Sequence, residues 1–441
     1  MNACSSSPIA MGNQIDKKKK KKASFDMKEN TSGFSKFLLL FAGEMISSIG
    51  SGLTSFGLGV YIFQKTGRAA DMALVTLMGF LPTLLLSLPA GTLADRHDRR
   101  LLMMIGDGLS ALGIFYILFC LLQGEISLWQ ICLGVFVSAF FSALLEPAFR
   151  ATITDLLTPD EYSKAAGLMS LAQSARFLIS PVIAGALLAV ADIKVLLVID
   201  ACTFFPTVFA AAAVKNSIKP KTRTDHKEQP SFLASMKEGW QSVSQNRGLL
   251  ILVLVSSLLT CFMGSFQILA QPIILAFANS ATLGAGETVC ACGMLASSLW
   301  LGAKGIQGGY LRIMSTALFA AGLCMAGFAW QENIWMVCIF GFLFFMALPF
   351  ANNCLDCLVR QVIPDRLQGR AWGMISFLSQ IGYVAAYTLA GSTADHLAAL
   401  FHISVGRGSA LILLIAGLLL SGTALGLLGI KPVQHLEKRT V

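Results

Sequence analysis

Twelve long apolar stretches divide this chain, and they limit its fold more than any other feature of the sequence. Each holds about 20 or more mainly apolar residues, which is the length that an α-helix needs to cross the hydrocarbon core of a bilayer. They lie at 36–63, 71–94, 101–122, 127–149, 163–190, 193–214, 248–276, 281–302, 309–329, 333–357, 369–393 and 408–430. The sequence therefore predicts an all-α membrane protein with twelve transmembrane helices.

The composition agrees with a chain whose solvent is lipid. Hydrophobic residues make up 55% of the 441 residues and charged residues 13%, with a mean hydropathy of +0.69. Soluble domains carry about 25% charged residues, so a soluble fold would expose too much apolar surface. The net charge of +9 does not indicate a nucleic-acid partner, because the basic residues cluster between the apolar stretches, as they do in cytoplasmic loops.

A polar segment between the sixth and seventh stretches is the natural boundary between two halves. It is rich in Lys, Asp, Glu and Gln. A second polar segment precedes the first stretch and contains a run of lysines at 17–22, and its low apolar content predicts disorder. The predicted organisation is, in chain order, a disordered basic cytoplasmic tail at 1–35, a six-helix bundle at 36–214, a cytoplasmic linker at 215–247, a second six-helix bundle at 248–430 and a cytoplasmic tail at 431–441.

The distribution of basic residues predicts the orientation of the chain. If both termini are cytoplasmic, the loops on the other side hold only four of the 33 Lys and Arg residues, namely Lys65, Arg68, Lys194 and Arg407. The reverse topology would break the positive-inside rule. The sequence therefore predicts a multi-pass membrane protein with both termini in the cytoplasm.

The two halves resemble repeats of each other. The fourth stretch ends with Glu146 four residues before Arg150, and the tenth ends with Asp356 four residues before Arg360. A Pro-Asp pair follows each of them. Parallel halves related by an axis along the membrane normal are one arrangement of secondary transporters. The spacing of acid and arginine suits either an intrahelical pair at the membrane edge or a gating pair.

A short charged loop between the second and third stretches carries the most specific motif. Its residues follow the pattern Gly-x-x-x-Asp-Arg-x-x-Arg-Arg, with Gly91, Asp95, Arg96, Arg99 and Arg100 at the fixed positions. One interpretation is a set of charges that only fixes the topology. The pattern also resembles the signature loop of the major facilitator superfamily, which holds the two halves together while a transporter is open outward.

This resemblance implies partners for the loop. Asp95 is expected at the start of the eleventh helix, where the positive end of the helix dipole favours a carboxylate. Arg99 and Arg100 are expected to pair with acids of the first half, of which Asp155 and Glu146 are the nearest candidates.

The resemblance covers nearly the whole chain, from about residue 36 to residue 430. It implies the fold of that superfamily, in which two six-helix bundles surround a central cavity. Further segments are similar to its bacterial macrolide-efflux and enterobactin-exporter-like branch, among them Leu81-Pro82, Pro89-Ala90-Gly91, Glu146-Pro147-Ala148-Phe149, Asp200-Ala201-Cys202-Thr203-Phe204 and Pro349-Phe350-Ala351-Asn352. The branch implies a monomer in the bacterial cytoplasmic membrane, with a small-molecule substrate and protons as its partners.

Ionisable residues lie deep inside predicted spans of the first half, among them Glu44, Asp107, Arg176 and Asp200. At 1.5 Å per residue, Arg176 lies roughly 18 Å into its helix, and Glu44 and Asp107 lie roughly 10–12 Å into theirs. Charges at such depth are costly and mark functional sites. The functional interpretation is a proton-relay or substrate-charge site in the first half, and the alternative is a set of buried ion pairs that hold helices together.

The fifth stretch contains Ser180-Pro181-Val182-Ile183-Ala184-Gly185, which resembles the Gly-Pro-x-x-Gly-Gly signature of drug:proton antiporters. Pro181 and Gly185 predict a kinked face of small residues that packs closely beside the cavity.

Motifs for other activities are missing from the sequence. Cys354 and Cys357 form a Cys-x-x-Cys pair, but no second pair and no nearby histidine accompany them, so no metal site is expected. There is no phosphate-binding loop and no Ser/His/Asp grouping. We therefore expect no cofactor and no enzymatic activity.

These observations predict export of an amphipathic organic compound by proton antiport with alternating access. Glu44 or Asp107 would bind protons and substrate competitively. Large side chains are candidates for the cavity wall, namely Phe56, Met78, Phe266, Trp300, Phe345 and Trp372. The alternatives are a dedicated exporter of a self-made peptide or siderophore, a lipid flippase and, in another class, a membrane receptor or scaffold that transports nothing.

Overall fold

The computed structural model describes residues 8–96, 98–158, 161–215, 240–241, 244, 247–306, 308–362, 368–430 and 434. Side chains are described from Gly33 onward, except at positions that are named below where they matter. Most of the predicted linker at 215–247 and of the predicted tail at 431–441 lies outside these ranges.

The described residues form long helices joined by short connections, and they contain no strand. The helices are α1 Pro8–Thr66, α2 Ala69–Arg96, α3 Arg99–Gln123, α4 Leu128–Ser142, α5 Leu145–Leu156, α6 Tyr162–Val190, α7 Ile193–Lys215, α9 Arg247–Leu275, α10 Ser280–Lys304, α11 Tyr310–Phe328, α12 Ile334–Val362, α13 Gln368–Phe401 and α14 Val405–Gly429. The predicted all-α fold class is confirmed.

The helices account for the predicted spans, with two differences. Eleven segments of the described chain are long and apolar enough to cross a membrane, and α10 is not among them. Its 25 residues are rich in Gly, Ser and Thr and include Glu287, which lowers its mean hydropathy. The fourth span is broken between α4 and α5. The break precedes Pro147, whose missing N–H leaves the carbonyl of Ala143 without its helical donor.

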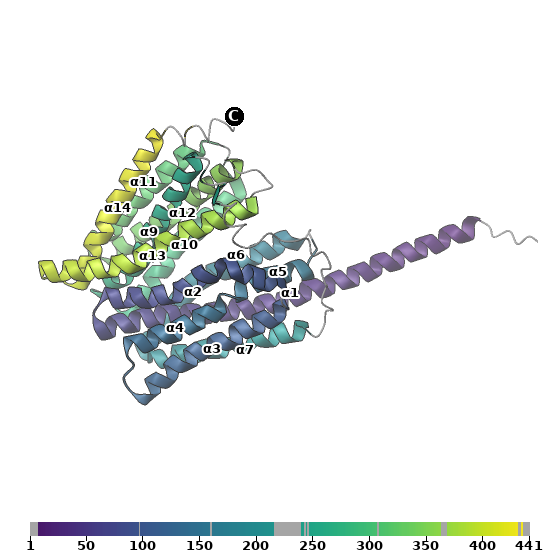
Figure 1. Cartoon of the computed structure of the whole chain (residues 1–441), viewed down its shortest axis with the longest axis horizontal. Coiled ribbons are helices and arrows are strands. Elements are labelled where there is room, and N and C mark those ends of the chain that lie inside the picture. The colour runs from purple at the N-terminus through teal and green to yellow at the C-terminus, as the bar shows by residue number, and fades with distance from the viewer. Residues whose placement is uncertain are drawn as a thin grey trace, which may run out of the picture.

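The helices form two groups, which are seen as two inclined bundles in Figure 1. In the first half, α1 packs against α6 and α7, and α3 packs against α4 and α7. In the second half, α9 packs against α13 and α14, and α11 packs against α12 and α14. The halves meet along two helix pairs, α2 with α13 and α6 with α10.

The two ends of this bundle differ in how the apolar core is connected. We call the end with residues 91–100 the motif end, and the end with the α1–α2 connection the opposite end. One core cluster runs through both halves and, in the first half, includes Leu58, Leu121 and Leu196 toward the opposite end. The motif end of the first half has a separate cluster around Phe37 and Met103. Among the described residues, the core that the halves share therefore lies toward the opposite end.

Glycines allow several helices to approach closely, as the predicted small-residue faces require. A Cβ atom added to Gly113 of α3 would collide with the carbonyl oxygen of Gly134 of α4, and one added to Gly293 of α10 with that of Phe342 of α12. Such contacts replace the hydrophobic effect as the source of helix association in lipid.

The first turns of α1 fall in the segment that the sequence analysis assigns to a cytoplasmic tail. Helix α1 begins at Pro8 and projects from the bundle before it enters the first half (Figure 1). Its buried side chains begin with Phe37 and Leu40, which are at most 1% exposed. The preceding residues include the lysine run at 17–22, and lysine is a good helix former where the apolar content predicts no packed structure.

Candidate functional site

The structure brings together the four ionisable residues that the sequence analysis singles out in the spans of the first half. Glu44 is on α1, Asp107 on α3, Arg176 on α6 and Asp200 on α7. Because α1 packs against α6 and α7, and α3 packs against α7, all four lie in the interior of the first half. We call them the charged cluster.

Asp200 lies directly against the backbone of α1. It is 1% exposed, and a Cβ atom added to Gly50 would lie 2.8 Å from its Oδ1 atom. The hydroxyl of Thr203, one turn along α7, donates to the same oxygen at 3.5 Å. Gly50 is therefore the residue that lets a carboxylate fit between α1 and α7.

Arg176 approaches α1 from the other side. A Cβ atom added to Gly52 would lie 3.2 Å from its Cγ atom, and the neighbouring Ser180 donates to the carbonyl of Ile49 at 3.0 Å. Asp200 and Glu44 are the acids whose charges act on the guanidinium. None of their described oxygens forms an ion pair with it within 4.0 Å, so Arg176 compensates the acids at a distance.

Two acids of the charged cluster have oxygens without a hydrogen-bond partner. Asp107 is 1% exposed, and its Oδ2 atom is buried and unpartnered, as is the Oε2 atom of Glu44. The two charges act on each other. A carboxyl oxygen in such surroundings needs a proton or a cation as compensation. These two groups are therefore suited to exchanging protons or holding a cationic group.

The predicted signature loop is described only in part. Gly91, Asp95 and Arg96 belong to the last turns of α2, but their side chains lie outside the described residues, as does that of Asp155. The predicted contact of Asp95 with the start of α13 therefore stays a prediction. The described part of the loop is ordered by Asp98, which caps α3 by accepting from the N–H of Arg100 at 3.0 Å.

The arginines of the loop contact the first half. Arg99 Nη1 donates to the carbonyl of Ala151 on α5 at 2.8 Å, and Arg100 is buried, with 6% of its surface exposed. Their predicted partner Glu146 instead pairs with Arg150, one turn away on the same helix, at 2.7 Å. Both side chains are more than half exposed, so this pair has the geometry of an intrahelical pair.

The corresponding pair of the second half is less fully described. Asp356 lies on α12, and the side chain of Arg360 lies outside the described residues. A gating role of this pair stays a prediction.

Pro181 and Gly185 lie where the two halves cross. A Cβ atom added to Gly185 would collide with the carbonyl of Ser280 on α10, and Gly284 touches the carbonyl of Pro181 in the same way. The hydroxyl of Ser280 donates to the carbonyl of Gly185 at 3.3 Å. The predicted small-residue face is thus a contact between α6 and α10.

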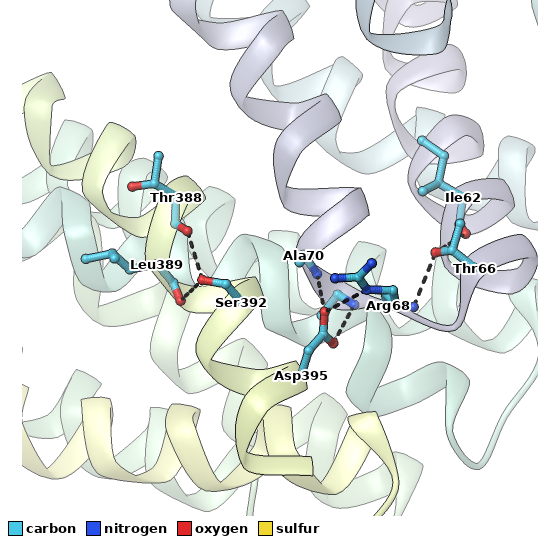
Figure 2. Close-up of polar contacts among 9 residues, drawn as sticks. Ile62, Thr66, Arg68, Ala70, Thr388, Leu389, Ser392 and Asp395 are labelled. Atoms are coloured by element: carbon cyan, nitrogen blue, oxygen red, sulfur yellow. Dashed lines mark hydrogen bonds and ion pairs between the residues drawn. The ribbon is translucent and has the colours of Figure 1, made fainter. Parts of the chain in front are cut away.

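A second contact between the halves involves Asp395 of α13, which the sequence analysis missed. Its Oδ1 and Oδ2 atoms accept from the N–H groups of Ala69 and Ala70, each at 2.9 Å, and Oδ2 lies 4.0 Å from Nε of Arg68. Figure 2 shows this carboxylate at the first turn of α2. A negative charge at a helix N-terminus satisfies free N–H groups and meets the positive end of the dipole.

The signal for Asp395 was weak in the sequence, because the predicted span ends at 393 and leaves the acid in a loop. A clearer signal was available for Glu287, the single acid of α10. It lies inside a predicted span, half-buried, and accepts from Nε2 of Gln271 on α9 at 3.3 Å.

The side chains proposed for the cavity wall have diverse surroundings. Phe56 and Phe266 are 5% and 3% exposed, and Phe266 stacks on Phe344 with ring centroids 4.5 Å apart. These two are core residues. Trp300 is 46% exposed at the motif end of α10, with Lys304 5.6 Å above its ring, and the side chain of Trp372 lies outside the described residues.

Comparison with known proteins gives one consistent family. Residues 40–387 match the Major Facilitator Superfamily. Macrolide efflux protein A of Streptococcus pyogenes is 26% identical over 368 residues, which cover 82% of this chain and 90% of that protein. Multidrug efflux pump Tap of Mycobacterium bovis is 24% identical over 385 residues, covering 81% and 87%. The solved nucleoside transporter NupG has a TM-score of 0.70 at 14% identity, over 90% of this chain and 100% of that one.

Proposed function

The chain belongs to the major facilitator superfamily, and we propose that it exports an amphipathic organic compound in exchange for protons by alternating access. As a member of that family it is a multi-pass membrane transporter and not an enzyme. Export as the direction of transport is supported by similarity to proteins named for macrolide and multidrug efflux.

The observation that carries proton exchange is the pair of unpartnered carboxyl oxygens on Glu44 and Asp107. They lie in a half of the protein where Arg176 is close enough to interact but not to form an ion pair. A buried carboxyl oxygen without a hydrogen-bond partner can take up and release a proton without breaking a structural bond. Its neutralisation also changes the net charge of the cluster, which can be linked to movement of the halves.

Alternating access is supported by the contacts that join the two halves toward the opposite end. Asp395 joins α13 to α2, and Ser280 and Thr288 of α10 donate to carbonyls of α6 at 3.3 Å and 2.8 Å. All these bonds lie toward the opposite end. With the positive-inside rule this end is the outer one, so the conformation is closed outward, and these contacts must break when the transporter opens outward.

The proposal is tested with inverted membrane vesicles that contain the protein and have an acidic lumen. The cytoplasmic face of these vesicles faces the medium, so export corresponds to substrate uptake coupled to proton release from the lumen. A panel of macrolides, cationic dyes and siderophores is added, and release is followed with a lumenal pH probe. Wild-type protein is expected to release protons with at least one compound.

Glu44→Gln and Asp107→Asn are compared in the same assay, with Glu332→Gln as the matched control. Glu332 is an acid of the opposite end that pairs with Arg407 at 2.6 Å, away from the charged cluster. We expect the control to behave like wild type and at least one variant of the cluster to lose proton release. Full release in both cluster variants would contradict the assigned acids, and substrate uptake without proton release would contradict antiport.

A further inference from the structure

A second polar group lies in the other half of the molecule, between α9, α10 and α13. It consists of Gln267 and Gln271, one turn apart on α9, Glu287 of α10 and Tyr387 of α13. We call it the acceptor cluster. Glu287 lies seven residues from the start of α10 at Ser280, which places it roughly 10 Å below the opposite end.

Two donors of the acceptor cluster are engaged within it. Gln271 Nε2 donates to Glu287 Oε1 at 3.3 Å, and the Tyr387 hydroxyl donates to Gln267 Oε1 at 2.7 Å. The Oε1 atom of Gln271 is buried and has no partner. The site therefore offers free acceptors, namely an amide oxygen and a carboxylate whose second oxygen accepts no described bond.

No fixed cation compensates Glu287. Among the described residues, no nitrogen of Lys, Arg or His lies within 4.0 Å of its carboxylate. The basic residues of its own helix and of α9 are Lys304 and Arg247, at the far ends of α10 and α9. This distinguishes Glu287 from Asp200 and Glu44, whose charges interact with Arg176.

Aromatic rings lie beside Gln267, whose Oε1 atom accepts from the Tyr387 hydroxyl. Phe80 of α2 packs against Tyr383 and Tyr387 with ring centroids 5.5 Å and 5.6 Å apart, the second pair edge to face. Rings of this kind attract a cation that sits over their faces. Phe80 belongs to the other half of the protein, so the aromatic wall spans the boundary between the halves.

The acceptor cluster also touches the first half through α1. A Cβ atom added to Gly59 would lie 2.6 Å from Oε1 of Gln271. A group bound to this oxygen would therefore lie between α1 and α9. Since the halves separate here when the transporter opens outward, such a group would gain access to the outer side.

We propose that the acceptor cluster binds the positively charged nitrogen group of an organic cation, with Glu287 as its counter-ion and the rings of Tyr383, Tyr387 and Phe80 as its apolar wall. This inference rests on the proposed transport function and assigns the substrate site to the second half and the proton acids to the first. A proton alone would need one acceptor and no aromatic wall, whereas an N–H-bearing cation uses both amide and carboxylate oxygens.

The test is equilibrium binding to the full-length protein in nanodiscs, without any gradient. The probes are ethidium, a permanent cation with amino groups, and Nile red, an uncharged dye. Glu287→Gln keeps the side-chain size and removes the charge, and we expect it to weaken ethidium binding at least about tenfold while Nile red binding stays unchanged. Glu332→Gln is the matched control and should leave both affinities unchanged.

Two further variants distinguish a contribution of the aromatic ring to binding from an effect on folding. Tyr387→Leu should weaken ethidium binding, and Tyr387→Phe should retain most of it, because the ring face remains. Equal ethidium affinity in wild type and Glu287→Gln would overturn the proposal, and so would failure of wild-type protein to bind ethidium.

A proton-release assay distinguishes this inference from the proposed function. Glu287→Gln should still release protons with an uncharged substrate, and loss of release with every substrate would make Glu287 a coupling acid and overturn the assignment. If no substrate released protons from wild-type vesicles, antiport would fail, while the binding result would still decide the role of Glu287.

Discussion

At the scale of single residues, the charged cluster is a set of groups that the bilayer interior makes expensive. Asp107 and Asp200 are almost fully buried, and Arg176, whose guanidinium interacts with the charges of Asp200 and Glu44, forms no ion pair with a described acid within 4.0 Å. Isolated buried charges of this kind reduce stability and are retained where they have a function. The residues that carry the proposed chemistry should therefore not be those that hold the protein together.

Asp107→Asn should accordingly leave the protein as stable as wild type or more stable. The change removes a buried acid whose Oδ2 atom has no partner, and it keeps the size of the side chain. Thermal unfolding in detergent, monitored by intrinsic fluorescence, checks this expectation. A fall of several degrees in Tm would show that Asp107 is a structural partner.

Gly50→Ala should have the reverse effect. The added Cβ atom would lie 2.8 Å from Oδ1 of Asp200 and closer still to the hydroxyl of Thr203, and overpacking of this type costs about 1–3 kcal/mol. Gly108→Ala on α3 is the control, because a Cβ atom there meets nothing within 4 Å and helix propensity favours alanine. A lower Tm for the first variant alone is the expected result, and equal Tm values would contradict the close packing of α1 and α7.

The charged cluster was predictable from the sequence because acids and arginines inside apolar stretches are rare and conspicuous. Its geometry was not, since the positions of Gly50 and Gly52 opposite Asp200 and Arg176 depend on the packing of α1 against α6 and α7. Glu287 had the same signal as the other acids and was missed, although it lies in a predicted span.

At the scale of helices, the contact between α13 and α2 closes the opposite end. Asp395 caps the first turn of α2 with both oxygens, and the carbonyl of Ala69 lies against the backbone of α13 at Gly391. A helix terminus and a carboxylate attract each other only while they are close. In the proposed alternating-access cycle, the contact therefore stabilises the outward-closed conformation without adding to the stability of the open one.

Asp395→Asn should shift the protein toward the outward-open conformation. Asn keeps one acceptor oxygen and loses the charge and the second bond, a loss of about 0.3–2 kcal/mol, or roughly a 2- to 30-fold change in the equilibrium. The distance between nitroxide labels on V190C and F401C, in a background free of other cysteines, reports the change. These positions are 86% and 60% exposed at the opposite end of the two halves.

The Glu332→Gln variant carries the same labels and serves as the control. An unchanged distance distribution in Asp395→Asn would show that the capping contact does not bias the two conformations.

The helices were largely predictable, because about 20 apolar residues define a span whatever they pack against. Their ends were less so. Helix α13 continues to Phe401, eight residues past the predicted limit, and α1 begins at Pro8. Helical turns outside the apolar stretch contribute nothing to its hydropathy. The apolar pattern therefore ends before the helix ends, and it does not predict these outer turns.

At the scale of the whole molecule, the halves are joined at the opposite end by two lines of contact, α2 with α13 and α6 with α10. The second line depends on glycines, which bring the α6 and α10 backbones together at Gly185 and Gly284. No sequence pattern within one chain shows which small residues meet across the halves. The small-residue face around Pro181 was predicted, but its partner on α10 was not.

Gly284→Val should force α6 and α10 apart and reduce the outward-closed population in the same labelled protein. A Cβ atom at Gly284 collides with the carbonyl of Pro181, whereas one at Gly302 of the same helix meets nothing within 4 Å. Gly302→Val is therefore the matched control for the loss of helix propensity. Equal distance distributions in the two variants would show that this crossing does not hold the end closed.

The central claim is that substrate and protons move in opposite directions through one protein, and a substrate gradient tests it most directly. Purified protein in liposomes, with equal pH on both sides, is given a compound that elicits proton release in the vesicle assay. Proton antiport predicts that outward flow of this compound drives protons inward, although no proton gradient is present at the start. The effect should disappear in Glu44→Gln or Asp107→Asn. Substrate flow at the same rate with no movement of protons would contradict it.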